Sequence, residues 1–126
     1  MAERLFTIEE ARAMLPEVRD RADRIVDVRA DLVTSTADHN AGIPTSVADI
    51  KAFEANLGEL LDGFRAWGLK VAGYAPLLLD FRAELDGNTV WLCWLENEPD
   101  IAWWHGDTVG FMGRRRLPDR PPATPG

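Results

Sequence analysis

The sequence predicts an α+β fold in which a long antiparallel helical hairpin packs on a short antiparallel three-stranded meander. Three observations support this prediction: a helix-capping motif near the N-terminus, a second apolar seam with helical spacing after a short loop, and three β-rich segments separated by tight turns. The chain has 126 residues, which suffices for one core but not for two. We expect one domain over residues 1–113 and a flexible Arg- and Pro-rich tail over residues 114–126.

The first helix should begin after Thr7 and run over about residues 8–37. Thr7 and Glu10 have the spacing of a capping box, in which each side chain bonds the backbone amide of the other residue. Pro16 removes one backbone hydrogen bond, so we expect a kink or a break there. The apolar positions that recur at near-helical spacing are Ala11, Leu15, Val18, Ala22, Ile25 and Leu32.

The second helix should cover about residues 47–67, because Ser46 is a good N-cap and Gly68 a good C-terminal stop. The intervening residues 39–44 have turn chemistry, so the two helices must run antiparallel. The seam of the second helix consists of Ile50, Phe53, Leu57, Leu60, Phe64 and Trp67. Two helices that bury one seam are unstable alone, so a further layer must cover them.

The remaining segments supply that layer as three strands at about residues 77–83, 89–95 and 101–105. We expect Glu84 to pair with Thr89 and Leu95 with Ile101, which sorts the side chains into two faces. The face toward the helices would be apolar and carry Leu77, Leu79, Phe81, Val90, Leu92, Trp94, Ala102 and Trp104. The opposite face, here called the mixed face, would carry Leu78, Asp80, Arg82, Trp91, Cys93, Leu95, Ile101, Trp103 and His105.

Composition restricts the classes of partner. The formal net charge is −7 although the last 13 residues hold four arginines against one aspartate, so the rest of the chain is strongly acidic. Such a body repels phosphate backbones, which argues against general nucleic-acid binding. No apolar run approaches the roughly 20 residues that span a bilayer, so we expect no membrane insertion. Cys93 is the only cysteine, which suits a reducing cytoplasm, and we expect a cytoplasmic protein.

Four segments carry a resemblance to a known family: FTIEEARAMLP near the start, LLLDF, VWLCWLENEPDIAWWH and GFMGR. Together they resemble the bacterial family called domain of unknown function 2203, from Phe6 to Arg114. The resemblance implies no particular activity. Asn97 stands where the family usually has glycine. Positions that match the family pattern are Glu10, Pro16, Asp80, Phe81, Cys93, Trp94, Glu98, His105, Gly110, Phe111, Gly113 and Arg114.

Candidate chemistry concentrates on the mixed face and its edges. Glu10, Glu98 and His105 could hold a divalent transition metal, since imidazole and carboxylate suit zinc, iron or manganese. On a flat sheet His105 would lie about 10 Å from Asp80, too far to share an ion. Cys93 reads as a small buried apolar residue rather than a nucleophile. A ligand pocket would use Asp80, Arg82, Trp91, Trp103 and His105.

Three functions fit these patterns. The first is a homodimeric interaction or accessory protein, in which a second copy shields Trp91 and Trp103. The second is a small ligand- or metal-binding protein or enzyme that uses the region of Asp80, Arg82, Glu98 and His105. The third is an anion binder that uses the arginines of the tail. The sequence does not decide whether the protein is an enzyme.

Overall fold

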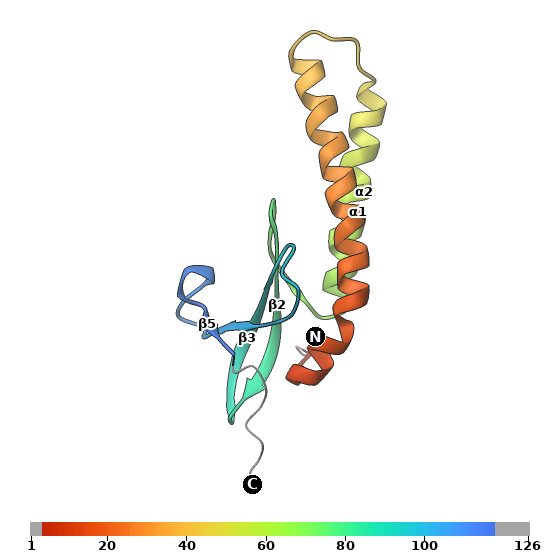
Figure 1. The fold of residues 1–126 in the computed structure, drawn as a ribbon. Helices are drawn as coiled ribbons and strands as arrows, with labels where there is room; N and C mark the ends of the chain where they lie inside the picture. The colour runs from red at the N-terminus through yellow and green to blue at the C-terminus, as the bar shows by residue number, and fades with distance from the viewer. Residues whose placement is uncertain (1–3, 118–126) are drawn as a thin grey trace.

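The computed structural model describes residues 4–117 and confirms the α+β class. A hairpin of two helices stands against one antiparallel sheet, and the sheet has five strands rather than the three that we predicted (Figure 1). The elements are α1 (Ile8–Asn40), α2 (Val47–Ala66), β1 (Lys70–Tyr74), β2 (Leu77–Leu85), β3 (Asn88–Leu95), β4 (Trp103–His105), the short helix η1 (Phe111–Gly113) and β5 (Arg115–Arg116). Within residues 4–117 no helix combines the length and apolar character needed to cross a membrane.

Helix α1 begins at the predicted capping box. The Thr7 hydroxyl accepts from the Glu10 amide at 3.0 Å, and the Thr7 amide donates to the Glu10 carboxylate at 2.9 Å. Pro16 does not break the helix, which continues to Asn40. The first turns, drawn in red, are tilted against the rest of the helix in Figure 1. Of the two predicted outcomes, a kink or a break, the break does not occur, because a proline two turns from the start removes only one hydrogen bond.

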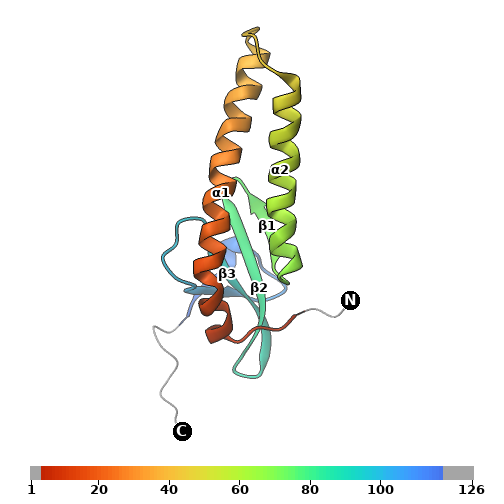
Figure 2. The same cartoon turned by 90° about the vertical axis from the view of Figure 1, so that its right-hand side faces the viewer.

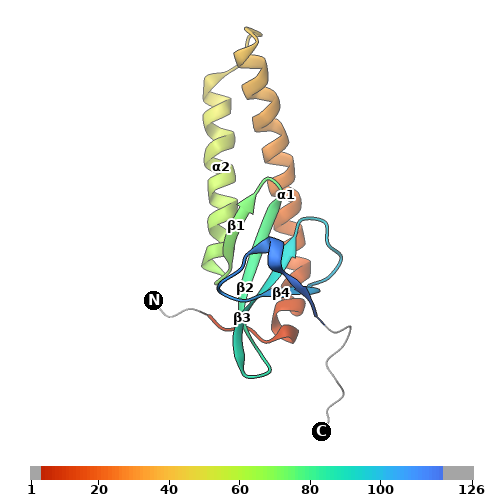
Figure 3. The same ribbon diagram turned by 90° about the vertical axis from the view of Figure 1, so that its left-hand side faces the viewer.

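Helix α2 starts where predicted, since the Ser46 hydroxyl accepts from the Asp49 amide at 3.1 Å. Its end at Gly68 is also confirmed, because this glycine has φ +89°, a conformation that L side chains rarely adopt. Figure 2 shows both helices over one face of the sheet, and Figure 3 shows the opposite face with η1 in front of it. The outer half of the hairpin extends beyond the sheet.

The predicted register is confirmed in both ladders that it concerns, β2–β3 and β3–β4. Glu84 pairs with Thr89 in the β2–β3 ladder, and Trp91 pairs with His105 in the β3–β4 ladder. The core prediction is also confirmed, because Leu57, Leu60 and Phe64 share one buried cluster with the apolar face of the sheet. The sheet contributes Leu77, Leu79, Phe81, Ala83, Leu92 and Trp94 to this cluster.

Ile101 lies elsewhere than we predicted. We placed it on the mixed face, but it is fully buried in the core. Strand β4 starts only at Trp103, so the period-two alternation does not reach back to Ile101. Arg12 of α1 holds this segment by donating to the Ile101 carbonyl from Nη2 at 3.0 Å.

The two additional strands lie at the edges of the sheet. Strand β1 pairs with β2 and has a register irregularity between Val71 and Gly73. Strand β5 pairs with β4, and the following Leu117 is buried. Residues 114–117 of the predicted tail therefore belong to the fold. The other tail residues, 118–126, lie outside the described residues.

Candidate functional site

The mixed face is partly covered by its own chain. After β4, residues 106–114 fold back over the sheet before the chain enters β5 (Figure 3); we call them the cover segment. We expected a second copy to shield Trp91 and Trp103; the chain itself covers part of this face, and both tryptophans are partly buried. The glycines at 110 and 113 indicated a bend over the sheet, but the return into β5 was missed because that strand fell within the predicted tail.

The buried centre of the mixed face is a pair of ionisable side chains. Nε2 of His105 lies 3.3 Å from Oδ2 of Asp80, although β3 separates their strands. Asp80 is 4% exposed and His105 6% exposed. The predicted separation of about 10 Å is wrong, because it assumed a flat sheet, whereas twisted strands let side chains two strands apart lean toward each other.

The geometry of this pair requires a proton between its members. Nδ1 of His105 is 2.9 Å from the Gly106 carbonyl oxygen, which can only accept, so Nδ1 carries a hydrogen. Nε2 and Oδ2 can then form a hydrogen bond only if one of them is protonated. Burial raises the pKa of Asp80, while the charge of His105 and a hydrogen bond to it partly oppose this shift. The other oxygen, Oδ1, has no hydrogen-bond partner within the described residues.

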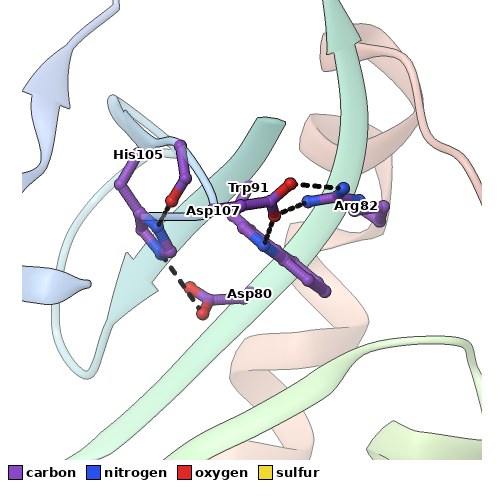
Figure 4. A network of polar contacts seen from close by, with 6 residues as sticks. Asp80, Arg82, Trp91, His105 and Asp107 are labelled. Carbon is purple, nitrogen blue, oxygen red and sulfur yellow. Dashed lines mark hydrogen bonds and ion pairs between the residues drawn. The ribbon is translucent and has the colours of Figure 1, made fainter. Parts of the chain in front are cut away.

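Arg82 and Trp91 form a second cluster beside this pair. The two residues are partners in the β2–β3 ladder, and the guanidinium of Arg82 stacks on the indole at 4.6 Å. Both bind the carboxylate of Asp107 in the cover segment (Figure 4). Trp91 Nε1 donates to Oδ1 at 2.9 Å, and Arg82 Nη2 to Oδ2 at 3.1 Å. The hydrogen bonds from Arg82 and then from Trp91 lower the pKa of Asp107.

Trp103 belongs to a third cluster, at the far end of the cover segment. Its ring lies 4.5 Å from the guanidinium of Arg114, which also lies 4.3 Å from the ring of Phe111. Arg114 pairs with Glu98 at 3.0 Å. Its Nη1 is 3.9 Å from the thiol of Cys93, and burial raises the pKa of that thiol to about 12. The prediction of a buried, unreactive Cys93 fits this environment.

The residues that we proposed as metal ligands do not come together. Glu10 caps α1, Glu98 is held by Arg114, and His105 pairs with Asp80. Among residues 4–117 no group of three or more histidine, cysteine, aspartate or glutamate side chains could hold a metal ion. Each of the three residues thus has a different partner, and the metal site stays a prediction without a ligand group among the described residues.

The predicted ligand-binding residues fall into these three clusters rather than into one pocket. Trp103 and Glu98 line a hollow of about 340 Å³, which Arg12 and Arg116 also border. A larger apolar groove of about 670 Å³ lies beside the turn between β1 and β2. Its lining residues are Gly73, Tyr74, Ala75, Pro76, Leu78, Leu95 and Phe111.

The arginines that we considered as an anion site stack on the sheet. Arg114, Arg115 and Arg116 lie over Trp103 or Trp104. Arg120 lies outside the described residues. Sequence reasoning missed Asp107 entirely. Asp107 follows His105 and Gly106, and nothing in this local sequence indicates that it would contact Arg82, which lies 25 residues earlier in the chain.

Comparison with known proteins agrees with the resemblance noted in the sequence. The model of the family described as "Uncharacterized conserved protein (DUF2203)" matches residues 4–117. No curated protein and no solved structure matches the chain. Because the match covers nearly the whole length, the chain belongs to the DUF2203 family of uncharacterized conserved proteins.

Proposed function

We propose that the protein is a homodimeric interaction protein whose dimer contact is the outer half of the helical hairpin. This part, here called the arm, comprises residues 26–56. The observation that carries the proposal is burial: the last buried residue of α1 is Ile25 and the first buried residue of α2 is Leu57, with none between them. Val28 and Leu32 at the base of the arm still pack partly on the core, but no third layer covers the helices farther out, and such a pair stabilises itself poorly.

The arm continues the apolar face that packs on the sheet. Val26 borders the sheet beside Trp94, and Val33 follows it by seven residues, which is close to two full turns. Leu61 packs against the core, and Val47 precedes it by fourteen residues, close to four turns. Val33 is 63% exposed and Val47 53% exposed, so this face lacks a cover in the outer part of the hairpin.

The charges of the arm either point away from this stripe or are paired with each other. Asp31 and Asp49 each lie two residues from Val33 or Val47, about 200° around the helix, and therefore point away from the stripe. Lys51 and Glu54 follow Val47 by four and seven residues and so lie on the same side of α2, where they neutralise each other in an ion pair. A two-fold axis would bring Val33 of one arm against Val47 of the other and close a four-helix contact.

The test is the molar mass in solution. Light scattering after gel filtration should give twice the chain mass for the wild-type protein and the monomer mass for Val33→Glu combined with Val47→Glu. Ala52→Glu is the matched control, because Ala52 is exposed on the arm about 140° away from Val47. A monomeric wild type at micromolar concentration, or a double variant that remains a dimer, would contradict the proposal.

A further inference from the structure

The cluster of Arg82, Trp91 and Asp107 consists of two unequal parts. Arg82 and Trp91 are fixed by direct pairing in the β2–β3 ladder, and the Arg82 side chain is only 15% exposed. Asp107 belongs to the cover segment, and its side chain is 60% exposed. A rigid, mostly buried donor set therefore holds a carboxylate that is itself largely at the surface (Figure 4).

The donor set matches the shape of a carboxylate. Two nitrogens of Arg82 reach the two oxygens of Asp107, which is the bidentate arrangement in which guanidinium and carboxylate planes fit each other. Trp91 Nε1 adds a third donor at 2.9 Å. The indole face also lies 5.1 Å from the ammonium group of Lys70, which adds positive charge next to the site.

We propose that Arg82 and Trp91 form a carboxylate-binding site, which the side chain of Asp107 fills in this structure and which the carboxylate of another molecule takes when Asp107 leaves. The site is separate from the arm, so it does not depend on the proposed dimer. The low pKa of Asp107 agrees with this view, because it reports that the donors favour an ionised carboxylate.

The tethered Asp107 competes with any outside ligand. An intramolecular group has an effective concentration on the order of millimolar or higher, so a weak free carboxylate cannot displace it. A ligand gains access either by adding contacts or after removal of Asp107. Val109, 47% exposed, and Met112, 94% exposed, are apolar side chains of the cover segment that a larger ligand could contact.

The experiment removes the internal competitor. In Asp107→Ala, sodium acetate should shift the indole N–H resonance of Trp91 saturably toward its wild-type position, and Trp91→Phe identifies that resonance. The wild-type protein should respond at least about ten-fold less at the same acetate concentration, because Asp107 already fills the site. Sodium chloride at equal ionic strength is the control for screening.

Two further variants make the result decisive. Asp107→Ala combined with Arg82→Gln should lose the acetate response, while the other four indole resonances report whether the fold is kept. Asp107→Asn keeps the volume of the side chain without its charge and should respond as Asp107→Ala does. Equal shifts in wild type and Asp107→Ala, an equal effect of chloride, or a response that survives Arg82→Gln would overturn the proposal.

The source of the carboxylate is distinguished by a second probe. The capped peptide acetyl-Gly-Asp-Thr-amide reproduces residues 106–108 of the chain. If it binds Asp107→Ala more tightly than acetate does, the site takes an aspartate within a peptide. If acetate binds equally well, the site reads the carboxylate alone and takes small organic acids. A failure of both probes would reject the site.

Discussion

The carboxylate of Asp80 and the imidazole of His105 form a buried bridge between β2 and β4, over the intervening strand β3. The two atoms lie 3.3 Å apart, and among the ion pairs of residues 4–117 this pair is the most deeply buried. In the ladders Asp80 pairs with Cys93 and His105 with Trp91, so the two side chains are also offset by two residues along β3. The contact therefore depends both on the twist of the sheet, which brings the two side chains together, and on the proton that their hydrogen bond needs.

Replacing Asp80 with asparagine should remove the loss of folding stability that comes from ionising a buried carboxyl group as pH rises. Burial raises the pKa of Asp80, so the protonated form stabilises the fold fully below the ordinary value of about 4, and this contribution is lost as pH rises through the folded-state pKa. Asparagine stays neutral and can still donate to Nε2 of His105. Urea unfolding from pH 4 to 8 should show Asp80→Asn gaining stability relative to wild type as pH rises.

The control for this experiment is Asp31→Asn, which removes an equal charge from an exposed position. Its stability should follow the wild-type pH profile. Parallel profiles for wild type and Asp80→Asn would show that the buried carboxyl does not titrate over this range.

The ion pair of Arg29 and Glu96 should be worth more than a surface pair. Its N–O distance is 2.8 Å, the two side chains are 19% and 11% exposed, and Glu96 also accepts from the Leu77 amide. Arg29→Ala leaves Glu96 buried without its charge partner, and we expect a loss of about 3 kcal/mol in the free energy of unfolding. Denaturation by urea measures it.

Acid should weaken the same contact. The hydrogen bond from Arg29 lowers the pKa of Glu96, so the stabilisation is present above the ordinary glutamate value and is lost as pH falls through the lower folded-state pKa. In Arg29→Ala this part of the acid sensitivity should disappear. The exposed pair of Asp62 and Arg65 is the comparison, and Arg65→Ala should cost less than about 1 kcal/mol.

The sequence predicted the fold where local signals repeated. Capping at Thr7 and Ser46 located both helix starts, and the alternation along β2 and β3 set the register that buries Leu79 and Trp94. Strand β1 was missed because it is short and contains Gly73, and β5 because two arginines before a proline-rich stretch suggest a tail. Their pairing depends on the neighbouring strands rather than on local propensity.

The candidate site could be predicted only in part. Period two placed Asp80, Arg82, Trp91 and His105 on one face, which the ladders confirm. The pairing of Asp80 with His105 depends on sheet twist, which a flat register does not contain. The contact of Asp107 with Arg82 and Trp91 depends on the path of the cover segment. The sequence of that segment has no helical or strand periodicity from which its path could be predicted.

Phe64 should be a major contributor to stability. Its side chain is fully buried, and it packs edge-to-face with Trp67 at 5.8 Å. Phe64→Ala should lower the free energy of unfolding by about 3–5 kcal/mol, because the core cannot collapse into the cavity completely. Phe53 lies eleven residues earlier in the same seam but is only partly buried. In the variant that combines Val33→Glu with Val47→Glu, Phe53→Ala should therefore lower the free energy of unfolding clearly less than Phe64→Ala does. Equal losses would mean that the arm is packed as tightly as the core.

Arg114 should control access to Cys93. It fastens the end of the cover segment by pairing with Glu98 and by stacking on Trp103. In wild type, labelling of Cys93 by a disulfide reagent should be slow, because the thiol is buried and its pKa is raised to about 12. The labelling rate should also keep rising with pH up to at least pH 9, without a plateau.

Arg114→Ala should label at least about ten-fold faster in native buffer, since the cover segment then opens more often. The direction of this change separates two effects of the substitution. The charge of Arg114 lowers the pKa of Cys93, so its loss alone would leave less thiolate and slow the reaction. A faster reaction therefore reports opening. Arg116→Ala is the matched control, because Arg116 also stacks on Trp103, at 5.4 Å, and should leave the rate near the wild-type value. An unchanged or slower rate in Arg114→Ala would show that the cover segment is held without this arginine.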